Sequence, residues 1–197
     1  MLAAVMTMLV ALNSTPALGE FAQAWASVHQ YTATIQLYEQ KGTNTEHAVF
    51  AYTFTKPSSL TMHVQQGPNS GATVVWSGSK TVVATKTGAF GISGSKTVSL
   101  HDSLVTSIRG STVKDLSFGS ILAHAKKTPG TIEQGPGVIA DQPVDVVTLT
   151  VTDPSKDRGL TREILYLSKA THFPVRVDGY DGSQLVQSLQ FAVTASK

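Results

Sequence analysis

The sequence predicts an α+β chain in which a curved antiparallel sheet or open barrel has helices packed against it. Only 14% of its 197 residues are charged, and Val and Thr are abundant, which favours strands over helices. Short runs of alternating apolar and polar residues, separated by turn sequences, fill most of the chain. Two stretches, residues 20–30 and 113–127, instead carry apolar residues at helical spacing.

The N-terminus has the features of a secretory signal. An apolar run from Leu2 to Leu12 is followed by polar residues and then by the small residues Ala17 and Gly19. This pattern predicts a signal peptide over residues 1–19, cleaved near Gly19, and therefore an exported protein. A buried N-terminal helix is the alternative, because no Lys or Arg precedes the apolar run. No linker interrupts residues 20–197, which we expect to form a single domain.

Two amphipathic helices are expected. The first carries its apolar stripe at i, i+3, i+4 and i+7, on Phe21, Ala24, Trp25 and Val28. The second begins at an N-cap that is either Asp115 or Ser117 and ends before Pro129-Gly130. Its apolar side carries Leu116, Ile121, Leu122 and Ala125.

The strands between these helices place bulky apolar side chains on one face. Residues 46–56 and 59–66 alternate, and Lys56-Pro57 between them indicates an edge, bulge or corner. One face of this pair carries Phe50, Tyr52, Phe54, Leu60, Met62 and Val64. That face either packs into a closed core or lines an apolar cavity, and the pattern alone leaves both interpretations open.

Turn sequences divide the remaining strands. The sequence SGSKTV occurs at residues 77–82 and again at 93–98, which predicts two hairpins with similar turn chemistry. Gly-Pro-Gly at residues 135–137 predicts a turn between two short strands.

Motifs that carry catalysis are not found. The six His residues lack metal-ligand spacing, there is no Cys, and neither a nucleophile elbow nor a phosphate-binding loop occurs. Two Ser-x-x-Lys sequences, Ser77 to Lys80 and Ser93 to Lys96, are expected in turns and have no partner motifs. A net charge of +2 gives no basis for nucleic-acid binding. We therefore expect no enzyme, no metal, no cofactor and no nucleic-acid partner.

The order of several short motifs resembles the LolA-like carriers of outer-membrane lipoproteins over most of residues 20–194. These motifs are a strand that ends in a basic residue and Pro at residues 54–57, Leu-Thr-Met at 60–62, the paired strands of 72–84, and a closing meander over 165–191. The family has Arg where this chain has Lys56, and an aromatic residue where it has Leu60.

The resemblance implies an unclosed, strongly curved antiparallel β-barrel with helices covering its concave face. It also implies a periplasmic monomer whose apolar cavity takes the acyl chains of a lipid or lipoprotein, between an inner-membrane donor and an outer-membrane acceptor. Lys56 and Pro57 occupy the family's basic-Pro position. The residues expected to line the cavity are Trp25, Phe50, Tyr52, Phe54, Leu60, Met62, Val64, Trp76, Leu116, Phe118, Ile121 and Leu122.

Three functions are compatible with the sequence. The first is a periplasmic carrier of lipid or lipoprotein. The second is an envelope-stress sensor or regulatory interaction protein on the same fold, without transport. The third is a small structural protein whose core is filled by its own side chains.

Overall fold

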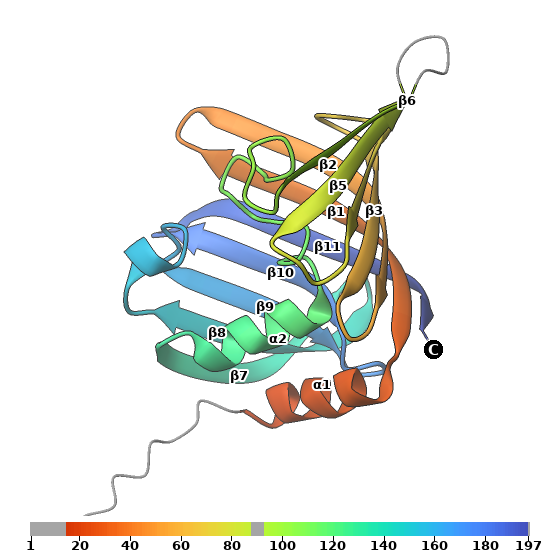
Figure 1. The fold of residues 1–197 in the computed structure, drawn as a ribbon. Helices are drawn as coiled ribbons and strands as arrows, with labels where there is room; N and C mark the ends of the chain where they lie inside the picture. Colours follow the sequence, from red (N-terminus) through yellow and green to blue (C-terminus); the bar gives the residue numbers. More distant parts are fainter. Residues whose placement is uncertain (1–14, 88–92, 197) are drawn as a thin grey trace, which may run out of the picture.

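The computed structural model describes residues 15–87 and 93–196, so most of the predicted signal region lies outside the described residues. The described chain forms one antiparallel sheet, two α-helices and a short 3-10 helix (Figure 1). No helix of this part of the chain is long and apolar enough to cross a bilayer.

The sheet is unclosed, as predicted. Its eleven strands are arranged in the order β6-β5-β4-β3-β2-β1-β11-β10-β9-β8-β7, and no ladder among the described residues joins the edge strands β6 and β7. The sheet curls strongly, and α2 lies inside its curve (Figure 1). The strands are β1 Gln30–Lys41, β2 Asn44–Thr55, β3 Ser59–Gln66, β4 Ala72–Trp76, β5 Thr81–Thr87, β6 Ser93–Ser99, β7 Gly130–Ile139, β8 Gln142–Val151, β9 Arg162–Ser168, β10 Pro174–Asp181 and β11 Gln184–Ser196.

Both predicted helices are present. The first, α1 (Pro16–Ser27), begins earlier than its apolar stripe indicated: Thr15 caps it, and Ala17 and Leu18 are buried. The second, α2 (Phe118–Lys127), is capped by Ser117, whose hydroxyl accepts from the Ser120 N–H, so the Ser117 alternative is the correct one. The 3-10 helix η2 (Pro154–Lys156) lies between β8 and β9.

The predicted inward face of β2 and β3 is confirmed by burial. Even-numbered residues of both strands are buried from Ala48 to Phe54 and from Leu60 to Val64. The strand pairing places Phe50 opposite Val64 and Tyr52 opposite Met62. Lys56 and Pro57 lie in the turn between the two strands, so the predicted corner is also confirmed.

Two of the turn predictions were wrong. Gly-Pro-Gly at residues 135–137 lies within the continuous strand β7 instead of ending it. Because β7 is an edge strand, one side of its backbone has no ladder to make, and the missing N–H of Pro136 is tolerated there. The first SGSK forms the turn between β4 and β5, whereas the second is part of β6 and pairs with β5, so the repeat does not mark two similar hairpins.

Candidate ligand-binding site

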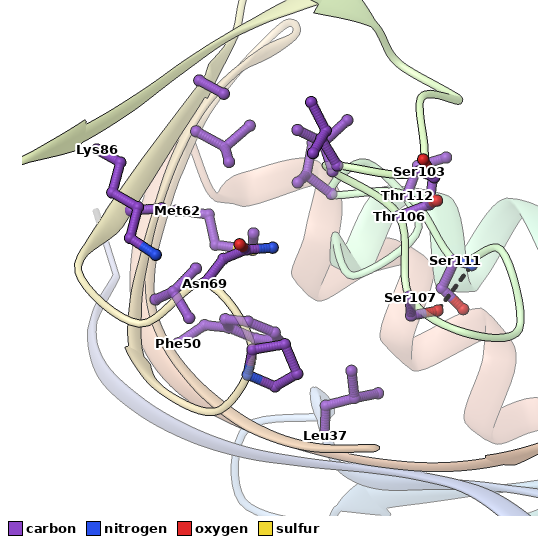
Figure 2. Close-up of a pocket in the computed structure, with 18 of the residues that line it drawn as sticks. Leu37, Phe50, Met62, Asn69, Lys86, Ser103, Thr106, Ser107, Ser111 and Thr112 are labelled. Carbon is purple, nitrogen blue, oxygen red and sulfur yellow. Dashed lines mark hydrogen bonds between the residues drawn. The ribbon is translucent and has the colours of Figure 1, made fainter. Parts of the chain in front are cut away.

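A cavity of about 420 Å³ lies between the concave face of β1–β6 and residues 103–116, which we call the roof segment (Figure 2). Its volume falls within the range of about 300–1,000 Å³ that is usual for small-molecule sites. The cavity is partly open to solvent and its exposed lining is mainly apolar. It is therefore a candidate site for an apolar or amphiphilic ligand.

The cavity exists because the inward-facing side chains become smaller along the sheet. Phe50 on β2 and Met62 on β3 are large, whereas β4 and β5 contribute the smaller Ala72, Val74 and Ala84 to the lining. The bulky Trp76 is also buried on this face of β4 but lies outside the lining. Small side chains on a curved sheet leave space above them that the chain fills only if another element packs there. Among the described residues, the roof segment and Pro68 and Asn69 of the β3–β4 loop cover this part of the sheet.

The roof segment has little regular structure of its own. Its single bridge joins Thr106 to Thr112, and the Asp115 carboxylate accepts hydrogen bonds from the N–H and the hydroxyl of Thr112, at 2.8 and 2.9 Å. Apolar side chains of the roof point to the cavity from Leu104, Val105, Ile108, Val113 and Leu116.

Two inward-facing glutamates hold the roof against the sheet. Glu46 accepts from the Ile108 N–H at 2.9 Å, and Glu39 accepts from the Arg109 N–H at 3.0 Å and from the Ser111 hydroxyl at 2.8 Å. Partial burial raises the pKa of Glu46, and the neighbouring negative charge of Glu39 raises it further. The roof is thus fastened at one end of the cavity by hydrogen bonds to these carboxylates, to the Gln40 carbonyl and to Gln187. Farther along, the Tyr52 hydroxyl donates to the Val113 carbonyl at 3.2 Å, and apolar contacts add to this attachment.

The other end of the concave face is a filled core and not a cavity. Tyr31 and Phe118 stack with ring centroids 4.4 Å apart, and Trp25 packs on Phe54 at 5.5 Å. Tyr31 also accepts the Phe118 N–H at 3.2 Å, and burial strongly raises its pKa. Both helices contribute aromatic rings to this cluster, so here the interpretation as a closed core is the better one.

The predicted site residues therefore divide into separate groups. Four of them line the cavity: Phe50, Met62, Val64 and Leu116. Four belong to the aromatic core or contact it: Trp25, Tyr52, Phe54 and Phe118. Leu60, Trp76 and Leu122 are buried elsewhere, and Ile121 lines a second pocket. Lys56 and Pro57 lie at the β2–β3 corner, outside the cavity lining.

The sequence analysis did not identify several residues that line the cavity. Leu37, Val74, Ala84, Lys86 and Lys96 line it, as does most of the roof segment. Small residues on alternate positions of β4 and β5 were the available signal. Residues 103–112 of the roof carry no periodic pattern, so only the fold shows where they lie.

A second pocket of about 210 Å³ contains a cluster of charged side chains. His124 Nε2 lies 2.6 Å from a Glu163 oxygen and 3.4 Å from an Asp157 oxygen, a grouping that could hold a metal ion. Arg158 lies 3.8 Å from Glu163 and 4.0 Å from Asp157. Asp157 and Glu163 raise the pKa of His124 to about 10, so two cations face two anions in this cluster, in which the buried Asp157 Oδ2 has no hydrogen-bond partner among the described residues.

Sequence comparison and structure comparison give different results. The sequence matches no protein-family model and no curated protein. The fold is similar to an outer membrane lipoprotein-sorting domain of Vibrio parahaemolyticus, at 15% identity and a TM-score of 0.48 over 91% of both chains. It is also similar to a LolA superfamily protein of Nitrosomonas europaea, at 11% identity and a TM-score of 0.37, over 93% of this chain and 94% of that one.

A third similar structure is the MucA/MucB complex of Pseudomonas aeruginosa, at 13% identity and a TM-score of 0.44. The match includes 93% of this chain and 59% of the other chain. All these scores are below 0.5, so the likenesses carry no weight for ligand or function. The resemblance to the LolA-like proteins is one of fold, and it rests on the unclosed sheet and on the helix inside its curve.

Proposed function

We propose that the protein is an exported, periplasmic carrier that binds an acyl chain of a lipid or lipoprotein in this cavity and hands it to an outer-membrane acceptor. The observation that supports the proposal is the cavity itself, whose mainly apolar lining includes the small side chains Ala72, Val74 and Ala84 under a roof without helix or strand. A closed structural core would place larger side chains at these positions.

Transfer energetics account for the choice of ligand. Burial of each methylene is worth about 0.8 kcal/mol, so ten methylenes contribute about 8 kcal/mol before the costs of ordering. An acyl chain bound in this way dissociates slowly into water but transfers readily to another apolar site. Delivery then requires the cavity to open toward an acceptor.

The roof segment is the element proposed to open. It is connected to the sheet by hydrogen bonds with Glu39, Glu46, Gln40, Gln187 and Tyr52, whereas α1 and α2 are joined to the sheet and to each other by packed aromatic rings. Opening the roof breaks these hydrogen bonds, several of them at the buried Glu39 and Ser111, but leaves the aromatic core intact.

A matched pair of substitutions tests the proposal. Val74 points into the cavity and is 3% exposed, whereas the next residue, Val75, points outward and is 41% exposed. We expect organic extraction and mass spectrometry of the purified protein to find an acyl lipid in the wild type and in Val75→Phe. We expect Val74→Phe to lose that lipid while its urea unfolding stays near that of the wild type.

The opposite results would identify another function. If the interior is filled, Val74→Phe overpacks it at a cost of about 1–3 kcal/mol, and no lipid is extracted from any variant. Recovery of an envelope protein without lipid would instead favour the regulatory interaction protein.

A further inference from the structure

Two lysines lie on the concave face where the cavity opens. Lys86 of β5 pairs with Gly94 of β6, and Ala84 of β5 pairs with Lys96 of β6. Residues with this diagonal relation on one face of an antiparallel pair are about 7–8 Å apart, within reach of long side chains. Both lysines line the cavity, and the Lys86 side chain runs from its strand toward the cavity interior (Figure 2).

The positive charge of this pair is not neutralised by the described part of the protein. Neither ammonium group has a carboxylate within 4.0 Å among the described residues, whereas Lys156 lies 2.9 Å from Asp153 and Lys169 lies 3.6 Å from Asp145. Glu46 lines the same cavity, but its Oε2 accepts the Ile108 N–H.

The residues between the two lysines are small. A Cβ placed on Gly94 would meet nothing within 4 Å, and Ala84 is the only other inward residue of this patch. The patch therefore offers open space flanked by two cations, directly beside the apolar lining of Met62 and Val74. An apolar chamber next to an unpaired cationic mouth is complementary to a molecule with a hydrocarbon tail and a negative head.

We propose that the cavity binds an amphiphile with one hydrocarbon tail and an anionic headgroup, carboxylate or phosphate, which lies between Lys86 and Lys96. The inference rests on the proposed lipid-binding function and adds a selectivity to it. Exposed ion pairs are individually weak, so two of them favour an anionic lipid over a neutral one of equal tail by roughly threefold to tenfold.

Competition binding tests this selectivity. A neutral fluorescent probe, N-phenyl-1-naphthylamine, is displaced by three ligands with the same tail: palmitate, palmitoyl lysophosphatidylglycerol and monopalmitoylglycerol. We expect both anionic ligands to compete threefold to tenfold better than the neutral one at low salt, with the difference falling in high salt. Inorganic phosphate alone is expected to displace nothing, because it lacks the tail.

A matched double variant isolates the two lysines. We expect Lys86→Gln/Lys96→Gln to lose the anionic preference and keep its affinity for monopalmitoylglycerol. Lys41→Gln/Lys80→Gln removes the same charge at exposed positions outside the cavity lining and is expected to keep the preference.

Each other outcome has a definite meaning. Equal affinity of the wild type for anionic and neutral ligands overturns the headgroup assignment and leaves the carrier function intact. Competition by inorganic phosphate overturns the requirement for a tail. Failure of every lipid to displace bound probe overturns the proposed function itself.

Discussion

The Lys56 ammonium group lies 4.3 Å from the centroid of the Trp25 ring and donates hydrogen bonds to the carbonyl oxygens of Trp25 and, at 3.3 Å, Ala26. These carbonyls belong to the last turn of α1, which has no basic residue of its own. Lys56 therefore fastens the end of α1 to the β2–β3 corner, by a cation–π contact and by a charge at the negative end of the helix.

Loss of this contact should weaken the attachment of α1. We expect Lys56→Met to lower the free energy of unfolding by about 1–2 kcal/mol, the sum of a cation–π contact and a C-terminal helix charge. Lys41→Met removes a charge at an exposed strand end without such contacts and is the control. Urea unfolding measures both, and equal effects of the two substitutions would contradict the role given to Lys56.

The start of α1 gives a second prediction. Ala17 and Leu18 are 2% and 0% exposed, and the Ala17 N–H donates to the Gln134 side chain at 3.1 Å. A chain that begins at Glu20, as after cleavage near Gly19, lacks these contacts and the Thr15 cap. We expect it to be less stable than a chain that begins at Thr15 by about 2–5 kcal/mol, the usual cost of deleting a buried Leu.

Leu18→Ala in the longer chain separates packing from helix length and should account for most of that loss. Urea midpoints measure the stabilities, and N-terminal sequencing of the exported protein measures where it begins. Equal stability of the two chains would mean that the first turn of α1 contributes nothing to the core.

The sequence was sufficient to predict which strand residues face inward, but not where along the sheet the cavity lies. Alternation placed Phe50, Met62 and Val64 correctly on the inner face, because a one-residue slip would turn all of them outward. Whether an inward side chain meets a partner depends on where the helices lie along the sheet. Tyr52 and Phe54 share this parity, yet they meet the rings of Tyr31 and Trp25.

The charged residues show the same limit. His124 lies near the end of α2 and Glu163 lies 39 positions later on β9, after β7 and β8. No sequence spacing rule predicts that these two residues meet. Lys96 was predicted to lie in a turn, and no sequence pattern placed Lys86 beside it. Only the pairing of β5 with β6 shows that both lie on the concave face.

Glu46 gives a prediction about the roof. Burial and the charge of Glu39 raise its pKa, so its charged form is disfavoured in the folded protein. A raised carboxyl pKa contributes stability below the ordinary value of 4.5, and this contribution is lost as pH rises through the folded pKa. At pH 7 we therefore expect Glu46→Gln, which keeps an acceptor for the Ile108 N–H, to be slightly more stable than the wild type.

The gain should be below about 1 kcal/mol, since solvent screens this site, and it should vanish as pH falls below 4.5. Urea unfolding between pH 4 and pH 8 measures it. Glu46→Ala, which leaves the Ile108 N–H without that acceptor, serves as the comparison and should be less stable than Glu46→Gln. A stability gain that persists in acid would show that the charge of Glu46 is not its cause.

The ion network of His124, Asp157, Arg158 and Glu163 predicts that the stability of the protein falls at alkaline pH. His124 faces Asp157 and Glu163, with Arg158 beside both carboxylates, and its pKa is raised from 6.5 to about 10. Because the folded pKa lies above the unfolded one, the network's stabilisation is complete below pH 6.5 and is lost as pH rises toward 10.

We expect the wild type to lose stability over this window by up to about 1.4 kcal/mol per pH unit, the limit for one proton, and His124→Gln to show a flatter profile. His63→Gln is the control, because His63 is exposed on β3 and contacts only the Thr73 hydroxyl among its described hydrogen bonds. Urea unfolding from pH 6 to pH 10 measures all three proteins. Parallel profiles for the wild type and His124→Gln would show that the imidazole does not carry the proton that links α2 to the two carboxylates.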